Sequence, residues 1–121
     1  MYQIDMMSRV PVYEQIINQT EKFILTGILS PGDKIPSVRN LSVELSVNPN
    51  TIQKAVAEMD RRGIVCSVPG KGCFVSDTAR KALMVAGLNN LNDLKEEIVK
   101  LKLAMVPKEK VLEIVEEVYK K

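Results

Sequence analysis

Polar residues gather at the start of one predicted helix, and their chemistry suits hydrogen bonding to an anion. Asn48 is a favourable N-cap, and Pro49 fits the first helical turn, where a missing N–H costs nothing. The next residues, 50 to 54, include no acid to offset the positive end of the helix dipole. We therefore predict that free N–H groups at this helix end are available to an external anion such as a phosphate.

The same helix has an apolar and a polar face. The apolar face follows the i, i+3, i+4, i+7 spacing through Ile52, Ala55, Val56 and Met59. The opposite face carries Asn50, Gln53, Lys54 and Ala57. Amide side chains can pair with base edges, and polar or cationic groups can bind backbone phosphates. An ordinary capped surface helix is the alternative that this segment alone leaves open.

The neighbouring segments favour the nucleic-acid interpretation. A short helix comes just before, with Ser37 as its N-cap and with Val38, Leu41 and Leu45 on one side. Only Ser46-Val47 separates it from the second helix, which is typical of a helix-turn-helix. Gly63 ends the second helix, and β-branched runs over 64–68 and 73–75 flank a Pro69–Gly72 turn, which predicts a hairpin. This order of elements predicts a winged helix.

Two further elements complete the predicted N-terminal domain, residues 1–76. A first helix over 11–26 has an apolar stripe formed by Tyr13, Ile16, Ile17, Thr20, Phe23 and Ile24. Ser30-Pro31-Gly32-Asp33 fits a type II turn, and residues 34–36 are long enough for a short strand that pairs with the hairpin. The predicted fold class is therefore mainly α with a small β-hairpin.

The second predicted domain, residues 77–121, is helical. A long helix runs until Pro107, with a coiled-coil-like seam of Leu91, Leu94, Ile98, Leu101 and Met105. Pro107 opens a shorter helix whose stripe is Val111, Ile114, Val115 and Val118. A link of one or two residues favours an antiparallel helical hairpin. We predict that both stripes form a dimer interface; packing of the hairpin on its own winged helix is the alternative.

Charge and length restrict the possible functions. The chain has 121 residues, 17 basic and 15 acidic, and the net charge is +1 on either side of Ser76. Any affinity for nucleic acid must therefore come from local placement of charge. No stretch approaches the length of a transmembrane helix, and the N-terminus lacks the regions of a signal peptide, so a cytosolic location without membrane association is expected.

Enzyme chemistry, cofactors and metal sites are not expected. Histidine is absent, which removes the commonest general base, and two cysteines cannot form a four-coordinate zinc site. A Walker loop around Gly70-Lys71 would need glycine at Val65 and serine or threonine at Gly72. If Val68 pairs with Cys73, Cys66 lies diagonally from Cys73, at or beyond disulfide reach, so both are expected to be reduced thiols.

About two-thirds of the chain resembles the GntR family of bacterial transcription regulators, most closely its YtrA-like branch. The similar segments are Pro11–Ile16, Gly27–Leu41, Val47–Ala55 and Gly70–Val75. The resemblance implies a dimer on an operator with two half-sites, with the recognition helix in the major groove and the wing near the minor groove. The branch carries a short helical dimerisation tail and is often encoded beside transporter genes, so transporter control is implied.

The resemblance also assigns roles to individual residues. Arg39 matches the family's phosphate-binding arginine, and the wing tip is matched at Gly70 and Lys71. Two departures matter: Pro49 stands where many GntR proteins have arginine, and Val68-Pro69 replaces residues that are often basic. The complete predicted DNA-binding set is Arg39, Asn48, Asn50, Thr51, Gln53, Lys54, Gly70, Lys71 and Gly72.

The leading hypothesis is a sequence-specific DNA-binding regulator, a repressor, acting as a homodimer on a two-fold symmetric operator. The alternative is a winged-helix scaffold that binds protein without specific DNA binding. Exposed aromatic residues would be expected of such a scaffold, and aromatics are only 4% of this chain. The sequence leaves open a small-molecule effector, the operator sequence and the regulated genes.

Overall fold

The structure is a computed structural model that describes residues 1–120. The elements in chain order are α1 (Val12–Leu25), β1 (Lys34–Ile35), α2 (Val38–Leu45), α3 (Pro49–Arg61), β2 (Val65–Val68), β3 (Gly72–Val75), α4 (Ala79–Leu103) and α5 (Lys108–Tyr119). They form two compact units, Met1–Met84 and Val85–Lys121. None of the helices within the described residues is both long and apolar enough to span a membrane.

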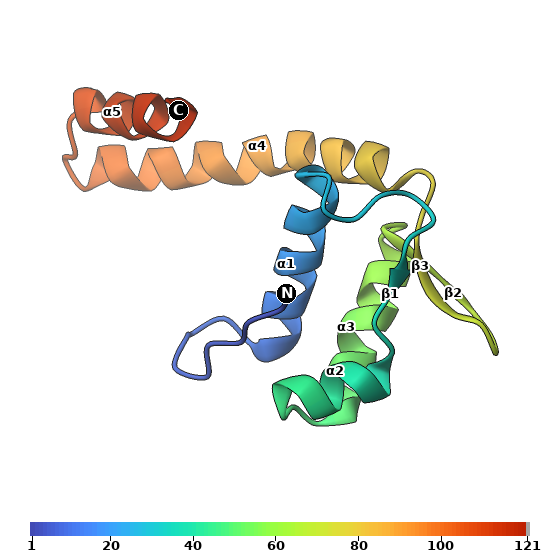
Figure 1. Ribbon diagram of the computed structural model, residues 1–121. Coiled ribbons are helices and arrows are strands. Elements are labelled where there is room, and N and C mark those ends of the chain that lie inside the picture. Colours follow the sequence, from blue (N-terminus) through green and yellow to red (C-terminus); the bar gives the residue numbers. More distant parts are fainter. Residues whose placement is uncertain (121) are drawn as a thin grey trace. The chain divides into compact units, whose positions relative to one another are not determined.

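The first unit is built around α3. Helix α1 packs along one side of α3, α2 crosses its N-terminal end, and β2 contacts it from the sheet (Figure 1). The apolar face predicted for α3 is buried in this core. The main side chains that share the core are Ile16, Ile17, Ile24, Ile35, Leu41, Ile64, Val65 and Val75. The predicted fold class is confirmed.

The three strands form an antiparallel sheet in the order β1-β3-β2. The predicted strand at 34–36 does pair with the hairpin, with Ile35 opposite Cys73. The expected hairpin register is wrong: Val68 lies opposite Gly72, because Pro69-Gly70-Lys71 closes a three-residue loop in which the Lys71 N–H donates to the Val68 carbonyl at 3.0 Å. Cys66 consequently opposes Phe74, one position out of step with Cys73, and both thiols are free.

Two glutamine side chains of α1 form hydrogen bonds with the backbone of the segment that precedes this helix. The Gln15 amide accepts from the Asp5 N–H and donates to the Asp5 and Val10 carbonyls, each at 2.9 Å. Gln19 likewise accepts from the Gln3 N–H and donates to its carbonyl. The buried Tyr2 hydroxyl lies 2.6 Å from Thr20 Oγ1, which donates to the Ile16 carbonyl. The first residues are therefore part of the folded unit.

The first turns of α4 belong to the same unit. Ala79 is fully buried and Leu83 is 8% exposed, and both are members of the core. The Arg80 guanidinium donates to the Leu25 carbonyl at 3.1 Å, at the C-terminal end of α1. These residues follow the predicted domain boundary at Ser76, so a fragment that keeps the whole core has to extend to Met84.

The second unit consists of the rest of α4 and of α5. Helix α5 turns back beside the C-terminal half of α4 (Figure 1). The expected link of one or two residues is wrong, because α4 ends at Leu103 and residues 104–107 make the connection. Met105 adopts a left-handed φ of 67°, and the Val106 N–H donates to the Leu101 carbonyl at 3.0 Å, as in a Schellman ending.

Candidate nucleic-acid interface

The turn between α2 and α3 is tight and specifically bonded. Ser46 adopts a left-handed conformation with φ 54°, and the N–H of the next residue, Val47, donates to the Ser42 carbonyl at 3.1 Å. The Ser42 hydroxyl donates to the Val47 carbonyl at 2.6 Å. Val47 is buried, so it fixes the turn to the core. The turn thereby sets the angle at which α3 leaves α2.

The N-terminal end of α3 differs in one respect from the sequence prediction. Asn48 is the N-cap, and its Oδ1 accepts from the Asn50 N–H at 2.8 Å. The Thr51 N–H donates to the Asn48 carbonyl at 3.0 Å, and Pro49 has no N–H. The prediction of free N–H groups at this helix end is therefore wrong for Asn50 and Thr51, because the side chain and the carbonyl of Asn48 accept from them. The positive end of the helix dipole remains without an acid in the first turn.

The outer face of α3 is exposed as its polar pattern predicts. Asn50, Gln53 and Lys54 are all exposed, whereas Ile52 and Ala55 are fully buried. Gln53 lines a groove of about 310 Å³ between α3 and the hairpin, with Val68, Pro69 and Gly70 on the other side. The structure thus places an amide of the candidate recognition helix beside the wing.

The remaining predicted contact residues lie on α2 and on the wing. Arg39 is exposed in the first turn of α2, where the Ser37 hydroxyl caps the helix by accepting from the Asn40 N–H at 3.0 Å. Lys71 is exposed between Gly70 and Gly72, which have left-handed φ values of 76° and 119°. Glycine suits both positions because a side chain is strained there.

Lys54 has a partner within the protein that the sequence did not reveal. Its Nζ lies 3.9 Å from the centroid of the Tyr13 ring, at the start of α1. This cation–π contact links the first turns of α1 with the middle of α3. Lys54 therefore holds the two helices together in addition to any contact with a phosphate.

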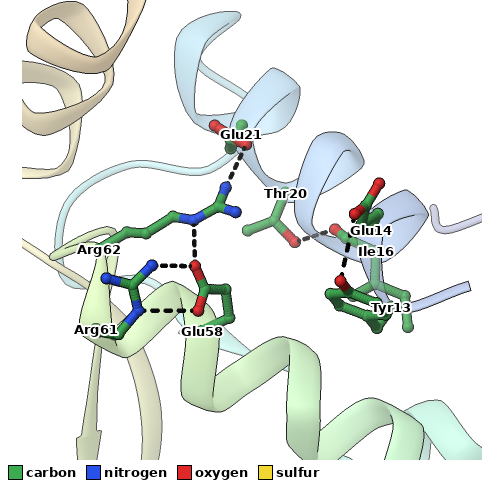
Figure 2. A network of polar contacts seen from close by, with 8 residues as sticks. All are labelled: Tyr13, Glu14, Ile16, Thr20, Glu21, Glu58, Arg61 and Arg62. Carbon is green, nitrogen blue, oxygen red and sulfur yellow. Dashed lines mark hydrogen bonds and ion pairs between the residues drawn. The ribbon is translucent and has the colours of Figure 1, made fainter. Parts of the chain in front are cut away.

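A network of charged residues fixes the C-terminal half of α3 (Figure 2). Glu58 accepts from the Arg61 Nε at 2.9 Å and from the Arg62 Nε at 2.7 Å. Arg62 also forms an ion pair with Glu21 of α1, at 3.7 Å. This network was not among the features predicted from the sequence, although Glu58 stands at i, i+3 and i, i+4 from the two arginines, a spacing that favours such pairs.

Glu58 should make the stability of the protein depend on pH. Hydrogen bonds from Arg61 and Arg62 lower the pKa of Glu58 from its usual 4.5 to about 2. A carboxylate with a lowered pKa stabilises the folded state above its usual pKa, and this stability is lost as pH falls from 4.5 towards 2. We expect Glu58→Gln to lower the free energy of unfolding near neutral pH and to have little effect near pH 2, measured by urea unfolding across pH.

The control for this prediction is Glu44→Gln, because Glu44 is exposed on α2 and makes no ion pair within residues 1–120. It should leave the pH dependence of unfolding close to that of the parent protein. Equal pH profiles for the parent protein and Glu58→Gln would show that the network does not stabilise the fold.

Helices α2 and α3 form a helix-turn-helix, the hairpin β2–β3 follows, and β1, which precedes α2, adds a third strand to the sheet. This arrangement defines a winged helix-turn-helix protein, in which α3 is in the position of the recognition helix. Residues 12–75 match the model of the bacterial regulatory proteins of the gntR family. The chain belongs to the GntR family. It is a transcription regulator with a DNA-binding domain, and not an enzyme.

Individual relatives support this assignment over nearly the whole chain. The HTH-type transcriptional repressor YtrA of Bacillus subtilis is 40% identical over 98% of this chain and 92% of its own length. A crystal structure described as a transcriptional antiterminator from Listeria monocytogenes EGD-e has a TM-score of 0.78 and 30% identity, covering 99% of this chain and 90% of that chain. The predicted membership of the GntR family, in its YtrA-like branch, is confirmed.

A third relative was crystallised with DNA. The DNA-binding domain of AraR in complex with operator ORE1 has a TM-score of 0.54 and 29% identity. The similarity covers 63% of this chain and 93% of that domain.

Proposed function

We propose that the protein is a homodimeric transcription repressor that binds a two-fold symmetric DNA operator. The observation that carries the proposal is the exposed apolar surface of the second unit. No residue between Val85 and Lys120 is buried in one protomer. The predicted seam leaves Leu91 57% and Leu94 52% exposed, and on α5 Ile114 is 58% exposed. An exposed apolar patch of leucines and isoleucines over two neighbouring helices is typical of a surface that binds another protein chain.

A second copy of the chain is the partner that fits this surface. Helices α4 and α5 leave a groove of about 480 Å³ between them, lined by Ile98, Val106, Val111 and Leu112 and by two lysines, so they do not cover each other completely. A seam spaced by three and four residues is the pattern by which helices of two chains interlock. A two-fold dimer would present two recognition helices to half-sites about one DNA turn, about 34 Å, apart.

The first unit supplies the DNA contacts in this proposal. Asn50 and Gln53, exposed on α3, read base edges in the major groove. Arg39 of α2 and Lys71 of the wing bind backbone phosphates, and Lys54 adds a third phosphate contact while it stacks on Tyr13. The structure of the AraR DNA-binding domain with its operator supports DNA as the partner of this unit.

Repression and location follow from the relatives. YtrA of Bacillus subtilis is named a repressor, and it matches this chain beyond the winged helix, through α4 and α5. A repressor acts by occupying an operator, which needs DNA affinity and dimerisation but no catalytic group. A bacterial regulator of this kind works in the cytoplasm, where its DNA is.

Selection of bound sequences from a random DNA pool, followed by footprinting on the enriched sequence, tests the proposal. We expect an enriched motif with two-fold symmetry and a footprint that covers both half-sites. Enrichment of an asymmetric motif protected over one half-site would reject the dimer. Failure to enrich any sequence would reject specific DNA binding and favour the protein-binding scaffold.

A further inference from the structure

Lys34 occupies an unusual position beside the wing. It lies in β1 opposite Phe74 of β3, while its neighbour Ile35 is buried in the core. Because strand residues alternate between faces, Lys34, Phe74 and Gly72 share the face of the sheet that points away from the core. The Lys34 side chain starts beside Phe74 and extends along this face towards the hairpin loop.

The end of the Lys34 side chain lies next to Gly72. A Cβ added to Gly72 would lie 2.8 Å from the Lys34 Cε and 3.5 Å from its Nζ. The Lys34 side chain thus lies flat across the backbone of Gly72, which leaves no room for another side chain. Gly72 also has a φ of 119°. Glycine at position 72 therefore allows the positive φ at the end of the loop, and it leaves space for the Lys34 side chain.

The acidic side chain next to Lys34 in the sequence has another partner. No ion pair involves Lys34 within residues 1–120. The adjacent Asp33 accepts from the Ser30 N–H at 2.9 Å, and Asp60 of α3 accepts from the Ser67 N–H of β2 at 3.2 Å. Lys71, the other cation of the wing, is exposed in the loop immediately before Gly72.

We propose that Lys34 is a second DNA-phosphate contact of the wing, held at the base of the loop by Gly72. This inference rests on the proposed DNA-binding function. It adds a positive charge to the wing, in which Val68 at the end of β2 and Pro69 in the loop carry none. The Lys34 ammonium lies beside Gly72, the residue that follows Lys71, so the wing has two cations near its loop that can bind backbone phosphates.

The alternative is that Lys34 only covers the sheet with its aliphatic stem. The variant Lys34→Gln separates the two interpretations, since glutamine keeps much of the stem and removes the charge. We expect the dependence of log affinity on log salt to become shallower by about 0.9 per bound protomer, equally on operator and on random DNA. Between 50 and 200 mM salt this corresponds to about a threefold change in affinity per contact.

Two variants serve as controls. Lys34→Arg keeps the charge and should keep the salt dependence. Lys22→Gln removes an exposed lysine from the last turn of α1 and should change nothing. Acetylation of the unmodified protein with and without DNA, followed by mass spectrometry, needs no variant: DNA should protect Lys34 and leave Lys22 reactive.

The outcomes distinguish this inference from the proposed function. If the parent protein binds its operator with a steep salt dependence that Lys34→Gln leaves unchanged, Lys34 is a structural residue and the inference is overturned. Equal acetylation of Lys34 with and without operator DNA overturns it as well. If the parent protein binds no DNA at all, the proposed function fails first.

Discussion

Replacing Leu94 or Ile98 with aspartate should leave the protein monomeric at micromolar concentration. Both residues belong to the predicted seam of α4 and are 52% and 38% exposed in the protomer, so a carboxylate there stays in contact with water until a second chain covers it. Loss of the dimer should lower affinity for a two-half-site operator at least about 100-fold, because the second half-site is no longer held at a high effective concentration. Affinity for an isolated half-site should not change.

Sedimentation and operator titration measure the two effects. The matched control is Asn92→Asp, which places the same carboxylate on α4 but outside the seam, and which should remain dimeric. A fragment ending at Met84 gives a second test, because it keeps Ala79 and Leu83 in the core and removes the second unit. Leu94→Asp protein that remains dimeric and binds its operator normally would contradict the proposed interface.

Removing the side-chain amide of Gln53 should relax the base preference at one position of each half-site. An amide that pairs with a base edge discriminates by about 1–3 kcal/mol, roughly 5- to 150-fold in affinity. Asn50→Ala should relax a neighbouring position in the same way. Both side chains are exposed and neither is in the core, so the free energy of unfolding should change little.

This prediction is tested by measuring the affinity of each protein variant for every single-base variant of the operator. Asn18→Ala, which removes an exposed amide from α1, is the control and should leave all preferences intact. Asn48 is less suitable for this test, since loss of its cap would also destabilise α3 by about 1 kcal/mol. Unchanged preferences in both Gln53→Ala and Asn50→Ala would exclude these residues as base readers.

Local signals made most of the first unit predictable. Ser37 and Asn48 cap their helices as expected, since a short polar side chain before an apolar stripe satisfies a backbone N–H. In the predicted turn the Asp33 N–H donates to the Ser30 carbonyl at 3.0 Å, and Gly32 has the positive φ that a type II turn requires. These features depend on residues a few positions apart, which a sequence displays directly.

Apart from the Glu58 network, the side-chain contacts that the sequence did not predict join residues without regular spacing. Gln15 and Gln19 bind backbone atoms of Gln3, Asp5 and Val10, and this pairing leaves no periodic pattern. The stacking of Lys54 on Tyr13 joins two helices that only the fold brings together. The roles of the predicted DNA-binding residues and of the seam stay predictions.

The exposed second unit also determines how this regulator would respond to its own abundance. No residue from Val85 to Lys120 is buried, and in the proposed dimer the two helices are covered only when two chains associate. Below the dissociation constant, dimer concentration rises with the square of protomer concentration, so halving the protein lowers operator occupancy about fourfold. Genes under its control would switch over a narrow range of regulator levels.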